Sequence, residues 1–235
     1  MNRWFAIACG TEVPRRHIGH HLLLGQELAV WRSDSGAINA WENRCPHRGV
    51  RLTLGTCEGE ELRCQYHAWR FASLTGQCTM IPAHPGQKPA STMRARTFAV
   101  AERDGFIWVN LTRDPSPGAP VGVAQAMDCT RSIFVNAPLH IVRETLLEGY
   151  PAGVDTPAAT VWNKDDYCLQ AGAADHDVLL TFLLQPASDS QTVIHGVLHT
   201  TVEESLHLSR LRHHSTTMSA VRDRAERHIA AGASP

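Results

Sequence analysis

The sequence has no long apolar segment, no basic tract and few aromatic residues, and each absence excludes a class of protein. No apolar run approaches the roughly 20 residues that a helix needs to cross a bilayer, so an integral membrane protein is not expected. Only 6% of the residues are aromatic, the formal net charge is −1, and no basic run is interleaved with aromatic residues. Nucleic acid is therefore not an expected partner. The first residues, Met1 to Ala6, lack the apolar core and cleavage site of a secretory signal.

A disulfide framework is also missing, because the seven cysteines are odd in number and mostly scattered. Five of them fall singly in unrelated segments: Cys9, Cys57, Cys78, Cys129 and Cys168. Scattered single cysteines are typical of reduced thiols in a reducing compartment, where most serve as small buried residues. This pattern predicts a cytoplasmic protein.

Two Cys-His pairs are the main chemical feature of the sequence. The first is Cys45-x-His47 within Cys-Pro-His-Arg-Gly, and the second is Cys64-x-x-His67 within Cys-Gln-Tyr-His-Ala-Trp. Thiolates suit the iron of a sulfide cluster, and neutral imidazoles in place of two thiolates raise the potential of that cluster. A structural zinc ion is the alternative, although zinc modules favour a C-x2-4-C knuckle that neither half contains.

Together the two motifs closely resemble those of the Rieske [2Fe-2S] domain of ring-hydroxylating (Rieske non-haem iron) oxygenases. The resemblance implies that Cys45 and Cys64 hold one iron of the cluster, while His47 and His67 hold the outer iron. The extra cysteine pair of respiratory Rieske proteins is absent beside these residues. A potential near the low end of the Rieske range, about −150 mV, is therefore expected.

The chain divides by pattern into two domains and a linker. Residues 1–111 contain short apolar runs between frequent turn signals, which indicates an all-β domain. Residues 112–122 are rich in proline and form the expected linker. The resemblance then implies a reduced helix-grip domain over residues 123–235, so that the fold class is α+β. Its expected elements are strands over 160–171, 178–186 and 192–200, and a final amphipathic helix whose apolar positions are Leu208, Leu211, Ser215, Met218, Ala225 and Ile229.

The second domain departs from the family at the mononuclear iron site. Catalytic subunits hold Fe(II) through a helix with a pattern like E-x3-D-x2-H-x4-H. Here Glu144 and Glu148 take the two acidic positions, but Pro151 stands where the first histidine should be, and Thr156, or Asp155, where the second should be. Proline has no side-chain donor, so the chain resembles an alpha subunit whose truncated catalytic domain lacks this iron. Glu148 then matches the aspartate that bridges a neighbouring subunit's cluster to the mononuclear iron.

Other histidines offer a poor replacement for the missing ligands. His195 and His199 share a strand face, but about 13 Å of strand separates them. Glu204, His207 and His213 mimic the missing spacing, yet on a helix the two histidines point more than about 100° apart. A metal site at these three residues is the basis of an alternative hypothesis.

The sequence therefore predicts an oxidoreductase component that passes electrons from a ferredoxin or flavin reductase to a mononuclear iron. That iron would be held by an oxygenase partner subunit in a hetero-oligomer, which the family's head-to-tail packing suggests is trimer-based. Two alternatives remain open: a self-sufficient mono- or dioxygenase with the unorthodox iron site, and a structural subunit that merely retains a cluster. The sequence identifies no substrate.

Overall fold

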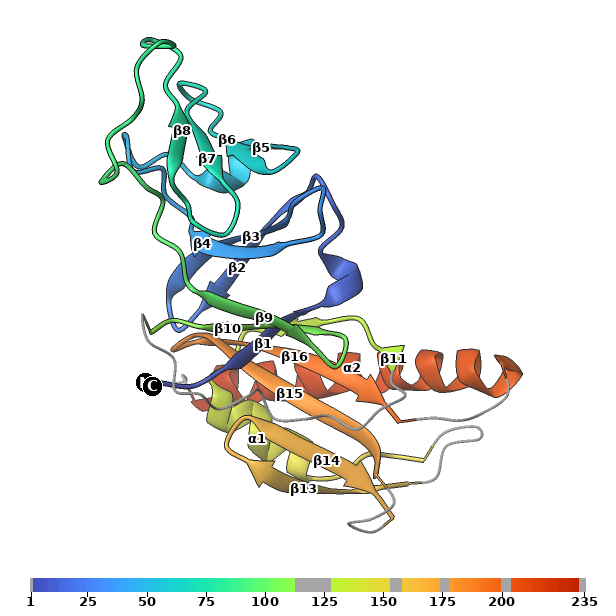
Figure 1. Ribbon diagram of the computed structural model, residues 1–235. Helices are drawn as coiled ribbons and strands as arrows, with labels where there is room; N and C mark the ends of the chain where they lie inside the picture. Colours follow the sequence, from blue (N-terminus) through green and yellow to red (C-terminus); the bar gives the residue numbers. More distant parts are fainter. Residues whose placement is uncertain (1, 113–127, 153–157, 174–177, 200–203, 233–235) are drawn as a thin grey trace. The chain divides into compact units, whose positions relative to one another are not determined.

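The computed structural model describes residues 2–112, 128–152, 158–173, 178–199 and 204–232 of the chain (Figure 1). These residues belong to two compact units, Met1–Pro120 and Val121–Pro235. The first unit is built of short strands with two 3-10 turns, and the second combines a sheet with two helices. The α+β fold expected from the sequence is thus confirmed. Residues 113–122 of the expected linker lie outside the described residues, as do Asp155 and Thr156.

The first unit contains three small antiparallel sheets, in the orders β1-β10-β9, β2-β3-β4 and β5-β6-β7-β8. The strand bounds are β1 Phe5–Cys9, β2 Ile18–Leu23, β3 Gln26–Arg32, β4 Ile38–Glu42, β5 Thr56–Glu58, β6 Glu61–Arg63, β7 Arg70–Ala72, β8 Cys78–Met80, β9 Ala99–Arg103 and β10 Phe106–Asn110. The 3-10 turns are η1, Gly10–Glu12, and η2, Leu52–Leu54.

The short apolar runs on either side of Gly25-Gln26 predict a hairpin, which is present as β2–β3 with its turn one residue earlier. Leu23 pairs with Gln26, so Leu24 and Gly25 form the two-residue turn, with φ angles of 50° and 77°. Two successive positive φ angles match the right-handed twist of the flanking strands. Gly25 accepts this conformation without strain, and the turn places Leu24, rather than Gln26, in the left-handed region.

The core of the first unit extends to the cysteines of both motifs. Trp31 and Trp41, from β3 and β4, are fully buried and meet edge to face at 5.1 Å between ring centroids. Cys45 and Cys64 belong to the same buried cluster of side chains. The two motif loops, which follow β4 and β6, are therefore anchored on a packed apolar core.

The second unit is an antiparallel sheet in the order β11-β16-β15-β14-β13, with β12 also paired to β16. Its strands are β11 Asp128–Cys129, β12 Ile133–Val135, β13 Thr160–Asp165, β14 Cys168–Gly172, β15 Val178–Ser188 and β16 Gln191–Leu198. The segment expected to form one strand over 160–171 is instead the hairpin β13–β14. Leu180, Phe182 and Leu184 alternate along β15 and contribute to one core, as their period of two predicts.

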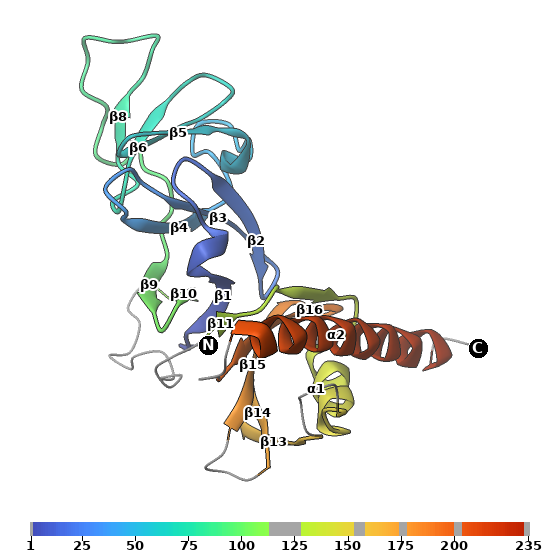
Figure 2. The same cartoon turned by 90° about the vertical axis from the view of Figure 1, so that its right-hand side faces the viewer.

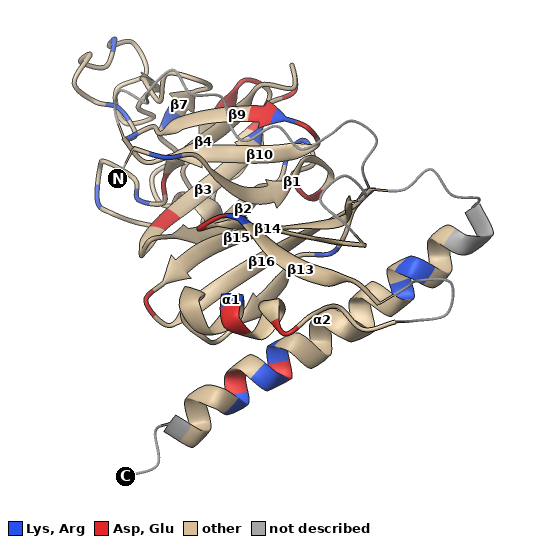
Figure 3. Cartoon of the chain, turned by 90° about the horizontal axis from the view of Figure 1, so that it is seen from below, with Lys and Arg blue, Asp and Glu red and all other residues tan. Residues whose placement is uncertain are grey.

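Two helices, α1 (Leu139–Leu147) and α2 (Glu204–Gly232), pack against this core on the same face of the sheet (Figure 2). The buried stripe of α2 differs from the expected one. Leu208 and Ile229 are exposed, as is Ser215, and the stripe consists of His214, Thr217, Met218, Val221 and Ala225. Acidic and basic side chains are mixed along the C-terminal half of α2 (Figure 3). None of the described helices is long and apolar enough to span a bilayer.

Candidate metal centre

The two motif loops have equivalent backbone hydrogen bonds despite their unequal Cys-His spacing. The amide of Cys45 donates to the carbonyl of Val50 (2.8 Å), and its carbonyl accepts from the amide of Gly49 (2.8 Å). The second loop repeats the pattern, since Cys64 donates to Trp69 (2.9 Å) and accepts from Ala68 (3.1 Å). Each cysteine therefore bonds to the fourth and fifth residues after it.

Each loop also closes through one residue with positive φ. Gly49 has φ 71° in the first loop, and Ala68 has φ 55° at the matching position of the second. A left-handed conformation costs a residue with a Cβ roughly 1–2 kcal/mol. Ala68 therefore makes the second loop strained, although the two loops form the same turn.

The side chains of the four motif residues separate by type. The two cysteines are buried, whereas His47 is half-buried and His67 is exposed. Burial, with a smaller contribution from the neighbouring Cys64, raises the pKa of the Cys45 thiol to about 11. The thiols therefore form the inner end of the site and the imidazoles the outer end. Cysteine binds a metal as the thiolate, so a metal held here would be bound at the inner end of the site.

The Nδ1 atoms of His47 and His67 lie 3.1 Å apart. Two nitrogen ligands of one metal, each about 2 Å from it and set at about a right angle, are separated by about 3 Å. The two imidazoles are therefore already aimed at one common point. Trp69 stacks on His47 at 4.3 Å and 8°, and Tyr66 lies 3.9 Å from His67 between ring centroids. These aromatic contacts fix the orientation of both imidazole rings.

Among the described residues, no three His, Cys, Asp or Glu side chains are grouped so as to hold a single metal ion. A binuclear cluster with two cysteines on one iron and two histidines on the other needs only pairs of protein ligands. The buried thiol pair and the outer imidazole pair fit that requirement. A single zinc ion would instead need all four donors around one point.

The comparison with known proteins agrees with this geometry. Residues 3–99 match the Rieske [2Fe-2S] domain family. The 3-chlorobenzoate-3,4-dioxygenase oxygenase subunit of Comamonas testosteroni is 41% identical over 101 residues, which are 42% of this chain and 23% of that protein. The structure of NdmA from Pseudomonas putida CBB5 covers 96% of this chain and 81% of its own, with a TM-score of 0.73 at 17% identity. That likeness shows that the fold of this chain is that of NdmA.

A longer similarity joins this chain to the oxidoreductase NdmD of Pseudomonas putida. The two are 39% identical over 241 residues, which cover 96% of this chain and 40% of NdmD. The chain therefore spans about two fifths of the length of that relative. The chain is thus similar over nearly its whole length to part of a relative named an oxidoreductase, and its residues 3–99 match the Rieske [2Fe-2S] domain, as the motifs predict.

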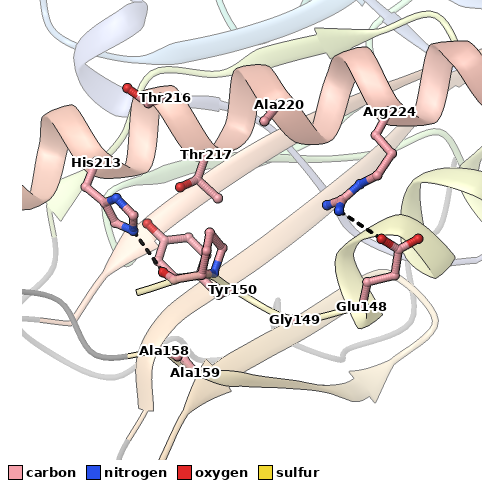
Figure 4. Close-up of a pocket in the computed structure, with 11 residues that line it drawn as sticks. Glu148, Gly149, Tyr150, Ala158, Ala159, His213, Thr216, Thr217, Ala220 and Arg224 are labelled. Carbon is pink, nitrogen blue, oxygen red and sulfur yellow. Dashed lines mark hydrogen bonds and ion pairs between the residues drawn. The ribbon is translucent and has the colours of Figure 1, made fainter. Parts of the chain in front are cut away.

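In the second unit, the segment that departs from the family lines a surface pocket of about 580 Å³ (Figure 4). Its lining includes Tyr150 and Pro151, which follow α1, and His213 and Arg224 of α2. Nε2 of His213 donates to the carbonyl of Pro151 (3.0 Å). Glu148, the first residue after α1, forms an ion pair with Arg224 (2.9 Å). The imidazole of His213 and the carboxylate of Glu148 therefore each bind a group of the protein itself.

The remaining sequence candidates do not meet in this pocket. His207 is not among its lining side chains, and the side chain of Glu204 is outside the described residues. His195 is buried and lies between Ser132 Oγ (2.9 Å) and Gln185 Oε1 (2.8 Å). His199 lies 2.8 Å from the hydroxyl of Thr181. Both strand histidines thus have local hydrogen-bond partners.

Sequence reasoning missed His214, which is buried in the core of the second unit. Its ring stacks near Phe182 and Tyr150, and its Nε2 lies 3.0 Å from Thr130 Oγ1. Burial, and to a smaller extent His213, lowers the pKa of His214 to about 4, so the ring is neutral at pH 7. The sequence did contain a signal, because His214 lies three residues after Leu211 and four before Met218. Because histidine is polar, it was not counted among the apolar positions of the helix.

Proposed function

We propose that this chain is the Rieske electron-transfer component of a multi-subunit oxygenase. It takes electrons from a ferredoxin or flavin reductase and delivers them to a mononuclear iron on a partner subunit. The observation that carries the proposal is the outer pair of imidazoles, aimed at one point above two buried cysteines. The similarity over nearly the whole chain to a relative named an oxidoreductase supports the same role.

Each residue at the proposed cluster in the first unit has its own role in this electron transfer. Cys45 and Cys64 would hold the inner iron within the apolar core, which excludes water from that end of the site. His47 and His67 would hold the outer iron at the surface, where an electron enters or leaves. Trp69 keeps the His47 ring in position through stacking. The bound [2Fe-2S] group supplies one-electron redox chemistry at a potential that neutral imidazole ligands raise.

The second unit supports the part of the proposal that this chain holds no mononuclear iron of its own. Two histidines and one carboxylate with open positions are the usual ligands for such an iron. Here Pro151 stands in place of one histidine, and its carbonyl accepts a hydrogen bond from the His213 imidazole. Arg224 neutralises Glu148, whose carboxylate is the only one among the described residues that line the pocket. These contacts support a partner subunit as the source of the catalytic iron.

Iron analysis tests this assignment directly. The purified, cluster-loaded protein should contain about two iron atoms per chain and, when reduced, show the low average g value of a Rieske centre. About three irons per chain would instead favour a self-sufficient oxygenase with its own iron site. Zinc without iron would refute the assignment. Electron transfer to an iron-bearing partner, followed by stopped-flow absorption, separates a working component from a merely structural subunit.

Glu148 is the proposed bridge to a partner subunit's cluster. Its carboxylate is paired with Arg224 but remains 44% exposed, so it is still available to a partner. Glu148→Gln preserves shape and removes the charge, and it should weaken hetero-oligomer assembly or slow inter-subunit electron transfer severalfold. Glu144→Gln is the matched control, because Glu144 is also exposed, one turn earlier on α1. Wild-type assembly and turnover in both variants would show that Glu148 has no role beyond its surface ion pair with Arg224.

A further inference from the structure

The two motif loops carry an excess of positive charge that the whole chain does not. The chain has 22 basic and 23 acidic residues. In contrast, residues 44–51 and 63–70 contain no Asp or Glu and five arginines: Arg44, Arg48, Arg51, Arg63 and Arg70. Charge of one sign is therefore concentrated on the loops that surround the proposed cluster.

Three of these five arginines are neutralised by neighbouring carboxylates. Arg51 pairs with Glu27 (2.8 Å) and Arg63 with Glu58 (3.4 Å). Arg70 pairs with Glu58 (3.1 Å) and more weakly with Glu61 (3.5 Å). These pairs leave the other two arginines to determine the charge of the loop surface.

Arg44 and Arg48 are exposed, and neither has an ion-pair partner among the described residues. They flank the first Cys-His pair directly in the chain. Arg48 directly follows His47 in the chain, so its charge lies close to the outer imidazoles. The outer end of the site therefore has a positive potential with no acidic counterpart on the same loops.

An exposed aromatic side chain completes this surface. Tyr66 is 59% exposed and lies against the ring of His67. Tyrosine and arginine are the residue types most enriched at the energetic centres of protein interfaces. Here both types surround the imidazoles at which an electron would enter or leave.

We infer that this surface, formed by Arg44, His47, Arg48, Tyr66 and His67, docks an acidic face of the electron-transfer protein with which the chain exchanges electrons. The inference deepens the proposed function and rests on it. Complementary charge steers a redox partner so that its prosthetic group faces the imidazoles, and it raises the association rate at low ionic strength. The Tyr66 ring provides apolar contact at the centre of the docked surface.

The experiment uses two haem proteins of opposite charge as probes, acidic cytochrome b5 and basic cytochrome c. The cluster-loaded chain is reduced with dithionite, separated from excess reductant, and mixed with either ferric cytochrome in a stopped-flow instrument. Each reduced protein gives up one electron, and one haem iron(III) becomes iron(II), which the haem absorption reports. Rates are compared between about 10 mM and about 300 mM ionic strength, because screening removes steering between surface charges.

We expect the rate with cytochrome b5 to fall roughly tenfold over this range, and the rate with cytochrome c to stay level or rise. Arg44→Gln and Arg48→Gln should each lower the low-salt rate with cytochrome b5 by roughly twofold to fivefold and flatten its salt dependence. Arg103→Gln is the control of equal net charge. It lies at the end of β9, in the sheet at the opposite end of the unit from β5–β8 (Figure 1), and should leave both rates unchanged.

The outcomes separate the docking surface from the electron-transfer function. Equal salt dependence with the two cytochromes, or equal effects of Arg44→Gln and Arg103→Gln, would overturn the docking surface and leave the function intact. No reduction of either cytochrome by fully reduced protein would overturn both. Arg44 and Arg48 adjoin the proposed ligands Cys45 and His47, so the iron content and spectrum of each variant are measured first. If Arg48→Gln loses iron, the salt dependence of the wild-type protein with the two cytochromes and the rates of Arg44→Gln still test the docking surface.

Discussion

Replacement of His67 by cysteine is expected to lower the midpoint potential of the cluster-loaded protein by on the order of 100 mV. Plant-type ferredoxins with four cysteines have potentials near about −400 mV, whereas Rieske centres with two histidines begin near about −150 mV. One exchanged ligand should therefore account for about half of that difference. The physical reason is charge, because an anionic thiolate stabilises the oxidised irons more than a neutral imidazole does.

The exposure of His67 makes this replacement feasible, since the new thiolate would lie at the surface and not in the apolar core. The potential is measured by a redox titration followed by electron paramagnetic resonance. His84→Cys serves as the control, because His84 is also exposed but lies outside both motif loops. A His67→Cys protein that keeps its iron at an unchanged potential would show that His67 is not a ligand.

Gly196→Ala is expected to destabilise the second unit by about 2–4 kcal/mol. A Cβ at Gly196 in β16 would overlap Thr130 Oγ1 and come within 2.6 Å of His214 Nε2. These two side chains lie 3.0 Å apart and are hydrogen-bonded in the core. The added methyl group must therefore break a buried hydrogen bond or displace the strand.

Urea denaturation followed by circular dichroism measures this loss, while the visible absorption of the cluster follows the first unit. The transition of the second unit should move to lower urea, and the cluster absorption should be retained in the folded protein. Gly86→Ala is the control, because a Cβ at Gly86 meets nothing within 4 Å. Equal stability of the two variants would mean that β16 can shift without cost.

The sequence by itself predicts the cluster ligands, because each Cys-His pair lies within one short loop. Ligands separated by one or two residues are placed by local backbone geometry, and the turn signals around them mark the flanking strands. The same locality explains why the β2–β3 hairpin and the alternation of Leu180, Phe182 and Leu184 were predictable. Local geometry did not specify the turn at Leu24, because a tight hairpin depends on the pairing register of both strands.

Only the tertiary structure decided which charged groups have ion-pair partners and which histidines have hydrogen-bond partners. The sequence placed Glu148 at the end of a helix, but Arg224, 76 positions later, contributes its ion pair. The spacing along α2 allowed His214 in the buried stripe, but only Thr130 and the Tyr150 ring, from other parts of the chain, make burial of this polar side chain possible. Arg51 differs from Arg44 and Arg48 because Glu27, on β3, forms its ion pair with Arg51. Such pairings join residues distant in the chain, and their energies depend on distances that only the folded chain sets.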